Sequence, residues 1–304
     1  MAIAQTLAYF DIFDYPLTAT ELYAYLWHHS AINQSAFLET LEKAKNSGIV
    51  EQKNGYYFLP GREDSISARE RAVRHVAHKL DRAKRAGKLI RYLPFLQAMF
   101  VCNTVAAGCS DETSDIDVLI VVKQGRIWLT RLFVTGLLGL FGLRRTKKKI
   151  VNQICLSFYL TDTNLNLQSI ALKEADIYLC YWIRQLLPVY DPSNLYQKIQ
   201  DANRWVNQWV APNAPYQLID RYRAPDTRLS SAVKNLFTAF WSGRYGDIIE
   251  SQAKQIQQTH MKFHPPVPSE NPRSVIMNDA MLKFHENDRR EYFRDEWRKR
   301  ISNF

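Results

Sequence analysis

The sequence predicts a protein of the α+β class, and three observations lead to this prediction. Residues 1–62 have the pattern of short helices that end in a β-hairpin, residues 89–190 contain short apolar runs typical of strands, and residues 191–304 are mainly amphipathic. The chain has 304 residues, is 46% hydrophobic and contains only 11 Gly and 12 Pro. This composition excludes a disordered or collagen-like chain and provides enough apolar side chains for two or three folded units.

The cysteines and the N-terminal residues indicate a cytoplasmic protein. The four cysteines form no CxxC pair and have no spacing of a small disulfide scaffold, so we expect reduced thiols. Residues 1–18 lack the basic and apolar regions of a signal peptide. The apolar run 128–143 has about 16 residues and includes Arg131, whereas a membrane span needs about 20. We therefore expect a buried or interfacial helix there and no transmembrane segment.

The first part of the chain is predicted to contain three helices and a hairpin. Thr18 and Glu21 fit a capping box that opens the second helix, and Ser35 is a suitable cap for a third helix over residues 36–45. The Asn54-Gly55 pair between two β-prone runs is a strong signal for a two-residue hairpin turn. This order of elements resembles a winged helix-turn-helix domain.

Winged helices are usually assumed to bind DNA, but the charges of residues 1–62 argue against that role. The third helix carries two lysines and two glutamates, and the hairpin carries Lys53 close to Glu51. Because a DNA-binding domain needs several cations to neutralise phosphates, nucleic-acid binding through this domain is not favoured. We expect it to serve as a packing or dimerisation module, which makes a homodimer one of the expected assemblies.

Charge is unevenly distributed along the rest of the chain. Residues 63–88 are predicted to form a basic amphipathic helix that links two domains. Residues 101–118 have a net charge of −4, whereas residues 119–150 have a net charge of +8 and no acidic residue. A positive field around a small acidic segment suits nucleotide phosphates held beside metal-binding carboxylates. Solvated helix faces are the alternative explanation.

Two aspartates begin the most apolar predicted strand. Residues 96–102 and 115–122 both have the pattern of strands, and residues 103–108 between them are mostly small. Because side chains alternate across a strand, Asp115 and Asp117 point to the same face and repel each other unless a cation lies between them. A divalent metal ion explains the pair; an exposed strand edge or a turn cap is the alternative.

The run Ser114-Asp115-Ile116-Asp117, followed by apolar residues, resembles the signature of the nucleotidyltransferase superfamily, which includes polymerase beta. The likeness covers about residues 89–165 and implies a mixed sheet flanked by helices within a core of residues 89–190. It also implies that Asp115 and Asp117 bind magnesium ions, which hold a nucleoside triphosphate such as ATP and activate an acceptor. Asn103 and Thr104 align with the Gly-Ser turn of the family. The nucleotide-binding candidates are therefore Asn103, Thr104, Ser114, Lys123 and Arg126, the last two for the triphosphate.

One departure from the family pattern leaves two functions open. Catalytic members usually carry a third carboxylate on a later strand, but the matching residues 154–160 contain no acid. Cys155 or Ser157 stands at the corresponding position, and Asp162 follows the strand. The resemblance therefore implies either magnesium-dependent transfer of a nucleoside monophosphate to an unknown acceptor, or a catalytically silent nucleotide-sensing or regulatory module with a winged-helix interaction domain.

Two further segments stand out by their composition. The basic cluster at residues 144–149 suits a polyanionic acceptor, an anionic membrane surface or a solvated helix end. Residues 191–304 are predicted to be mainly helical. Their tail, residues 283–297, mixes charged and aromatic side chains, and we expect it to pack across the core rather than to line an acceptor site.

Overall fold

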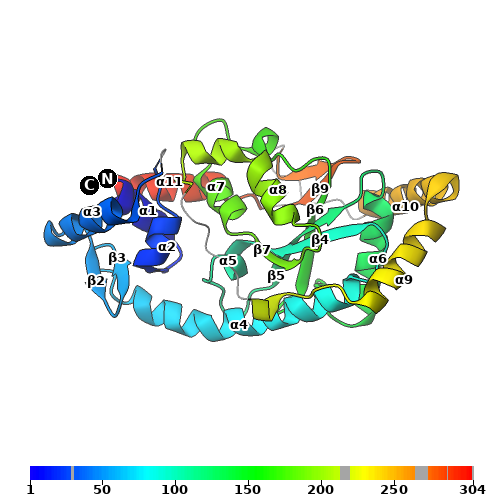
Figure 1. Cartoon of the computed structure of the whole chain (residues 1–304), viewed down its shortest axis with the longest axis horizontal. Coiled ribbons are helices and arrows are strands. Elements are labelled where there is room, and N and C mark those ends of the chain that lie inside the picture. The colour runs from blue at the N-terminus through cyan, green and yellow to red at the C-terminus, as the bar shows by residue number, and fades with distance from the viewer. Residues whose placement is uncertain (29–30, 213–219, 264–272, 286, 303–304) are drawn as a thin grey trace.

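Helices and two separate β-sheets build the chain, which confirms the predicted α+β class (Figure 1). The computed structural model describes residues 1–28, 31–212, 220–263, 273–285 and 287–302. The smaller sheet has three strands and belongs to the N-terminal part of the chain. The larger sheet has six strands and forms the centre of the molecule.

The N-terminal part alternates helices with short antiparallel strands. The three strands lie in the order β1-β3-β2. The sequence did not indicate β1, which has only two residues and pairs with the hairpin. The elements are α1 (Ala2–Asp11), β1 (Leu17–Thr18), α2 (Ala19–Ala24), α3 (Gln34–Asn46), β2 (Glu51–Lys53) and β3 (Tyr56–Phe58).

Local signals in this part are largely confirmed. The side chain of Thr18 and that of Glu21 cap α2 reciprocally, as the predicted capping box requires. Asn54 has a φ of 53°, and the glycine after it has a φ of 81°, as a two-residue hairpin turn demands. The predicted cap of α3 is wrong: Asn33 rather than Ser35 accepts the hydrogen bond from the first turn, so the helix starts two residues earlier.

A single long helix, α4 (Ser65–Ile90), connects the N-terminal part with the central sheet. Its 26 residues correspond to about 39 Å at the usual rise per residue. Leu80, Ala83 and Ile90 of this helix are buried against one face of the sheet. The basic linking helix is therefore also part of the core of the central region.

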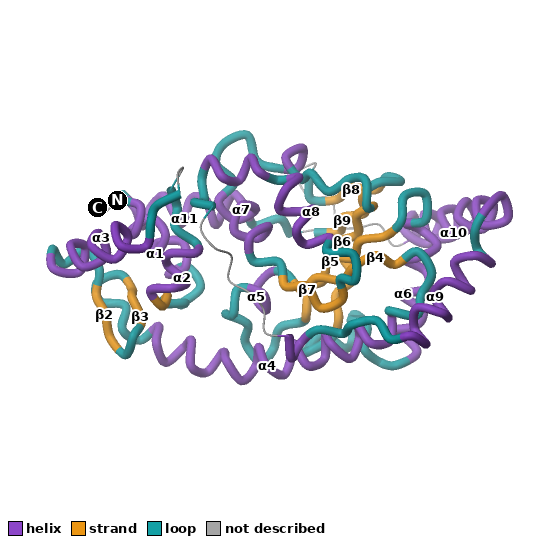
Figure 2. The backbone as a smooth tube through the Cα atoms, in the orientation of Figure 1, coloured by secondary structure: helices purple, strands orange, loops and turns teal. Residues whose placement is uncertain are grey.

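The central sheet is mixed, and its strands follow the order β7-β4-β5-β6-β9-β8 (Figure 2). The neighbours β5 and β6 are parallel, whereas every other neighbouring pair is antiparallel. Because β5 and β6 are parallel and adjacent, both strands begin at the same end of the sheet. The strands are β4 (Leu96–Val101), β5 (Ile116–Val122), β6 (Ile154–Thr161), β7 (Leu187–Tyr190), β8 (Val275–Met277) and β9 (Met281–Phe284).

Different helices cover the two faces of this sheet. Leu119 of β5 packs in a core with α7 (Ile177–Arg184), α8 (Leu195–Ala202) and the N-terminal helices. Ile120 points to the opposite face and packs in a core with α4, α6 (Ile127–Leu140) and α10 (Gly243–Phe263). Because both faces are covered, β5 is almost continuously apolar. Alternation along the strand places Asp117 on the same face as Leu119.

The C-terminal region is mainly helical, but it also extends the central sheet. After α9 (Arg228–Phe240) and α10, strand β9 pairs with β6, and β8 pairs with β9. The last helix, α11 (Arg290–Ile301), returns to the N-terminal helices, where the indole of Trp297 donates a hydrogen bond to the carbonyl of Gln5 at 2.9 Å. The two chain ends are drawn close together in Figure 1.

None of the described helices combines the length and the hydrophobicity that a membrane span requires. The helix α6, which holds most of the apolar run 128–143, has 14 residues and buries one side in the core.

Candidate functional site

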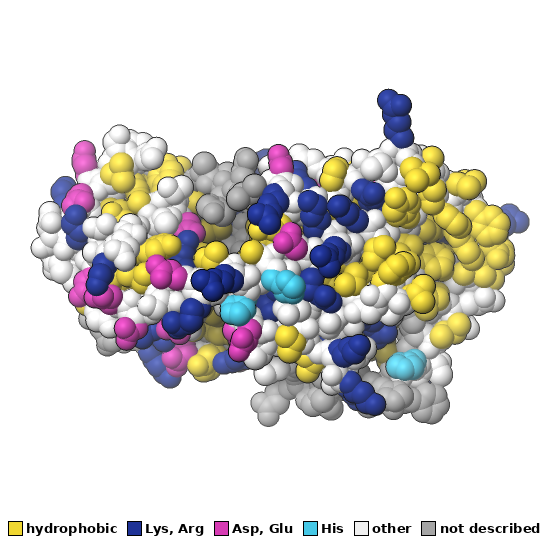
Figure 3. Space-filling model, turned by 90° about the horizontal axis from the view of Figure 1, so that it is seen from below, with side chains coloured by type: hydrophobic (Ala, Val, Ile, Leu, Met, Phe, Trp, Pro, Cys, Tyr) yellow, Lys and Arg dark blue, Asp and Glu magenta, His cyan; other side chains and the backbone are white. Residues whose placement is uncertain are grey.

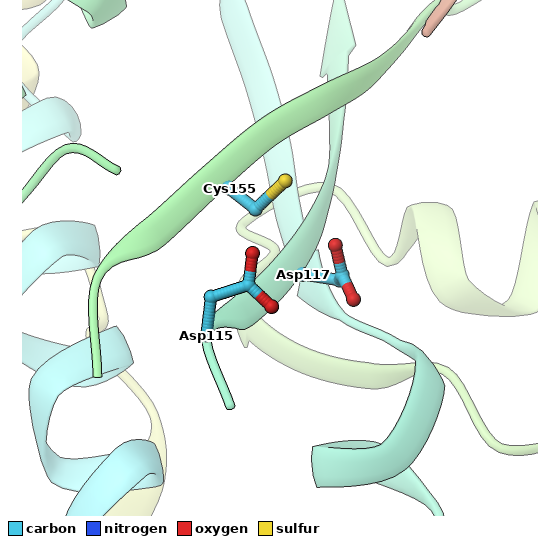
Figure 4. Close-up of side chains that lie close together, drawn as sticks. All are labelled: Asp115, Asp117 and Cys155. Carbon is cyan, nitrogen blue, oxygen red and sulfur yellow. The ribbon is translucent and has the colours of Figure 1, made fainter. Parts of the chain in front are cut away.

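Two aspartates and a cysteine meet where β5 and β6 begin (Figure 4). Asp115 directly precedes β5, and Asp117 is its second residue. In the parallel pairing of the strands, Cys155 of β6 lies opposite Asp117. One ligand atom from each of the three side chains lies within 4.8 Å of the others. The position expected for a third carboxylate is therefore filled by a thiol.

A β-bulge in β6 shapes this end of the sheet. Between Asp117 and Leu119 there is one residue, whereas between their partners Cys155 and Phe158 there are two. The extra residue lets both Cys155 and Phe158 face the side on which Asp117 lies. Bulges of this kind are frequent beside binding sites, where they redirect a side chain.

Burial and mutual repulsion raise the proton affinity of the cluster. Burial, reinforced by the charge of Asp115, raises the pKa of Asp117 above its usual range, although a hydrogen bond from Asn103 opposes the shift. Burial also raises the pKa of the Cys155 thiol to about 12, with the two aspartates adding to the effect. A cation that approaches the metal-free cluster therefore stabilises the ionised form of its acidic groups.

One cation already lies against the cluster, because Arg145 reaches it from the basic segment. Its Nη1 atom is 2.8 Å from Oδ2 of Asp115 and 3.5 Å from Sγ of Cys155. The contact with Asp115 is an ion pair without hydrogen-bond alignment, and this buried oxygen accepts no hydrogen bond from any described residue. The Arg145 side chain is 44% exposed, so it can leave the carboxylate for solvent.

The predicted turn residues support the aspartates directly. Asn103 begins the short helix α5 (Asn103–Ala106) with a φ of 55°, the left-handed conformation expected of a residue in place of Gly. Its side chain donates to Oδ2 of Asp117 at 2.8 Å and accepts from the Tyr178 hydroxyl at 3.1 Å. Thr104 lines the adjoining cavity. Ser114 instead fastens the loop before Asp115, since its hydroxyl lies 2.6 Å from that of Ser110.

A cavity of about 760 Å³ opens beside the cluster, and Asp117 and Cys155 are part of its wall. Most charged side chains of the wall are basic. Arg144 and Lys147 have no acidic partner within ion-pair distance among the described residues, so their charges remain available to a bound anion. The basic residues of the wall are Arg131, Arg144, Arg145, Lys147, Lys283, Arg289 and Arg290.

The C-terminal tail forms the far wall of this cavity, contrary to the expectation that it only packs across the core. His285 lies with its Nε2 3.1 Å from the hydroxyl of Ser157. Phe293 of α11 stacks on Tyr178 with ring centroids 5.0 Å apart. The tail therefore both packs and lines the cavity; Glu286 within it lies outside the described residues.

The structure does not bring Lys123 and Arg126 to the cluster. Both follow the C-terminal end of β5, about 20 Å from its start at the usual rise per residue. Lys123 pairs with Asp162 at 3.3 Å, and Arg126 pairs with Asp247 at 2.7 Å. Since β6 runs parallel to β5, Asp162 is also at the wrong end of the sheet to supply a third carboxylate.

Other basic residues line the cavity beside the cluster, and the sequence identified only some of them. Arg144, Arg145 and Lys147 belong to the basic cluster, whose density was visible in the sequence. Lys283 and Arg289 come from the tail: β9 brings Lys283 beside β6 through a pairing that the sequence did not indicate, and Arg289 directly precedes α11.

In comparisons with known proteins, no family model, no curated protein and no solved structure matches the chain.

Proposed function

We propose that the chain is a nucleotidyltransferase-like protein that binds a magnesium–nucleoside triphosphate complex and transfers the nucleoside monophosphate to an acceptor. The observation that carries the proposal is that acidic and basic side chains lie around the same cavity at different positions. Asp117 is part of the cavity wall with Asp115 beside it, whereas Arg144 and Lys147 of the same wall have no acidic partner among the described residues. A triphosphate with its metal ion has the same distribution of charge.

The donor set at the start of β5 fits a hard divalent cation. Carboxylate oxygens are the ligands that Mg²⁺ prefers, and one oxygen of Asp115 is buried without a hydrogen bond. Asp115 and Asp117 would hold the ion, with Cys155 at the third corner. When bound, the metal supplies Lewis-acid stabilisation of the charge that develops on the phosphoryl oxygens.

Each protein group then has a physical task. The hydrogen bond from Asn103 holds the carboxylate of Asp117 in one orientation, so the ligand is positioned before the metal arrives. With Asp115 holding a metal ion, the half-exposed Arg145 would be available, together with Arg144 and Lys147, to bind the triphosphate. These cations stabilise the charge of the departing pyrophosphate.

We also propose that residues 1–62 form a winged-helix module that serves packing. The order of its elements and the strand order β1-β3-β2 support the first part of this interpretation. The second part rests on Tyr9 and Phe10, whose rings pack against Tyr181 of α7 at 4.4 Å and 5.1 Å.

A catalytically silent nucleotide sensor is the second candidate, and Cys155 is the observation that favours it. Without metal the Cys155 thiol is neutral, since burial raises its pKa to about 12, and sulfur is a softer ligand than the carboxylate oxygens that Mg²⁺ prefers. Such a module would bind the nucleotide in the same cavity without transferring it.

The test compares the chain with the double variant Asp115→Asn/Asp117→Asn. Nucleoside triphosphates labelled at the α-phosphate are incubated with the protein and magnesium across a broad set of acceptors. We expect label transfer and pyrophosphate release by the unmodified chain, and a loss of at least about a hundredfold in the variant, because both metal ligands lose their charge. Glu112→Gln is the matched control, since it removes an exposed acid from the loop before β5.

The outcomes separate the two candidates. Transfer that persists unchanged in the double variant defeats the assignment of Asp115 and Asp117. Magnesium-dependent binding of the triphosphate without any product, abolished in the double variant, identifies the silent sensor instead.

A further inference from the structure

One end of the molecule exposes an unusually apolar surface. Leu229, Leu236 and Phe240 of α9 are 65%, 69% and 62% exposed, and Ile248 and Ile256 of α10 are exposed to a similar degree. Figure 3 shows the hydrophobic side chains gathered at the end of the molecule that α9 and α10 occupy in Figure 1. Single exposed apolar residues are ordinary, but a contiguous set on two neighbouring helices marks a binding surface. We call this set the apolar end.

Two more exposed apolar residues stand where α6 ends. Leu140 is 81% exposed, and Phe141 is 55% exposed. The helix packs along α10, and Phe133 on its inner side contacts Trp241 with ring centroids 5.5 Å apart. The first half of α6 therefore packs against α10, and Leu140 and Phe141 lie at the other end of α6, next to the basic residues 144–149 in the chain.

Basic residues, without acids, accompany the apolar residues in two of these segments. The chain contains no Asp or Glu between Asp117 and Asp162, nor between Asp226 and Asp247. The first interval holds α6 and the exposed Lys148 and Lys149, and the second holds α9. The cations and the exposed Leu140 and Phe141 are thus only a few residues apart in the chain.

We propose that the apolar end docks on a lipid surface that carries anionic headgroups. Apolar side chains that protrude from a helix insert at the boundary between headgroups and acyl chains, and nearby lysines are attracted by the negative surface. A second copy of the chain fits less well, since a symmetric contact through α9 would bring two basic helices without acids together, and Asp247 of α10 is already paired with Arg126. The docking is peripheral and does not depend on the proposed transfer reaction.

Docking in this way would place the cavity close to the lipid surface. The loop that carries Lys148 and Lys149 also carries Arg144, Arg145 and Lys147, which form part of the cavity wall. A protein anchored through this loop holds the cavity next to the lipid surface.

The test is sedimentation of the full chain with vesicles of phosphatidylcholine alone or of an equimolar mixture of phosphatidylcholine and phosphatidylglycerol. We expect binding to the anionic vesicles that weakens as salt is added. Leu236→Asp/Phe240→Asp should reduce the vesicle affinity more than about tenfold, because it removes apolar contact and adds negative charge. Lys148→Gln/Lys149→Gln should reduce it about thirtyfold.

Matched variants control for the surface changes themselves. Leu38→Asp replaces an exposed leucine of α3, and Arg71→Gln/Arg74→Gln neutralises two exposed cations of α4. Both should leave vesicle binding unchanged, and circular dichroism checks that every variant folds. Absence of binding to anionic vesicles at low salt overturns the proposal, as does equal binding to both vesicle types. So does a dimer in sedimentation equilibrium that Leu236→Asp/Phe240→Asp dissociates without any vesicle binding.

Discussion

Cys155 is the residue that distinguishes the two proposed functions, nucleotidyl transfer and nucleotide binding without transfer. It lies opposite Asp117 and within reach of the same ligand position. Because the thiol is neutral when no metal is present, the cluster carries two negative charges rather than three, and Arg145 offsets one of them. The free protein therefore avoids the cost of a third buried charge but also offers a weaker site to a hard cation.

Cys155→Asp should give the cluster a third carboxylate and so make it a stronger magnesium site. Without metal, the added buried carboxylate should lower the free energy of unfolding by about 3 kcal/mol, since it faces two like charges. Saturating magnesium should restore most of that loss, because the ion binds only the folded cluster. Thermal unfolding with and without magnesium measures both effects.

Cys155→Ser is the control for this prediction. It changes the thiol to a hydroxyl of similar size without adding a charge, so its stability should respond to magnesium as that of the unmodified chain does. A Cys155→Asp variant whose unfolding temperature shows no larger response to magnesium than Cys155→Ser would contradict the assignment of this corner to the metal site.

At the scale of elements, a buried ionic network fixes the C-terminal tail to the sheet. Asp288 accepts from Arg290 at 2.7 Å and lies 3.4 Å from the ammonium of Lys283 on β9. Arg290 also reaches Asp176, which caps α7, at 2.9 Å. The side chains of all four residues are less than a tenth exposed. The network therefore joins β9, α7 and α11 around one wall of the cavity.

Asp288 makes this network dependent on pH. Burial alone would raise the pKa of Asp288, but hydrogen bonds and charge from Arg290, with the charge of Lys283, outweigh it and lower the pKa to about 2. Between this value and the ordinary pKa near 3.8, the unfolded chain binds more protons than the folded one. The contribution, about 2 kcal/mol, is present above pH 4 and is lost as the pH falls toward 2.

Asp288→Asn should remove that dependence. We expect the free energy of unfolding to fall by about 3 kcal/mol at neutral pH, because two buried cations lose a shared partner, and the loss below pH 4 to become shallower. Urea unfolding at a series of pH values measures both. Asp295→Asn, at an exposed position on α11, is the control and should retain the slope of the unmodified chain. Equal slopes in the two variants would refute the role of Asp288.

The elements that the sequence predicted well are those with a long or local signal. The periodicity of α4, the apolar runs of β4, β5 and β6, and the Asn54-Gly55 turn all depend on neighbouring residues. The three short strands β7, β8 and β9 depend on pairing with distant segments instead. β7 also contains Pro188, which argues against a central strand but is tolerated on this edge strand.

In the candidate site, too, the residues that could be predicted are those that depend on local sequence. The pair Asp115 and Asp117 could be predicted because strand alternation alone puts both side chains on one face. Lys123 could not be placed correctly by its proximity in sequence, since an extended strand separates it from the pair. The selection of Cys155 depends on the register between β5 and β6, and the contribution of Lys283 depends on the strand that returns from the C-terminal region.

At the scale of the whole molecule, the N-terminal part and the central sheet share one hydrophobic core. Residues of α1, α2 and α3 belong to the same buried cluster as Leu119 of β5, Phe158 of β6 and the helix α7. Tyr181 of α7 lies at the junction, with its ring stacked on Tyr9 and its hydroxyl donating to the carbonyl of Tyr25 at 2.8 Å. We therefore expect residues 1–62 and the sheet to unfold together.

Tyr181→Ala should break this cooperativity. The variant loses the aromatic contacts that link the two parts and should lose about 3–5 kcal/mol of unfolding free energy, as large-to-small changes in cores do. Differential scanning calorimetry should show one transition for the unmodified chain and two for Tyr181→Ala. Leu138→Ala, in the core on the opposite face of the sheet, should lower the transition temperature while leaving a single peak. Two transitions in the unmodified chain, only one of them shifted by Tyr181→Ala, would instead show that residues 1–62 fold independently of the sheet.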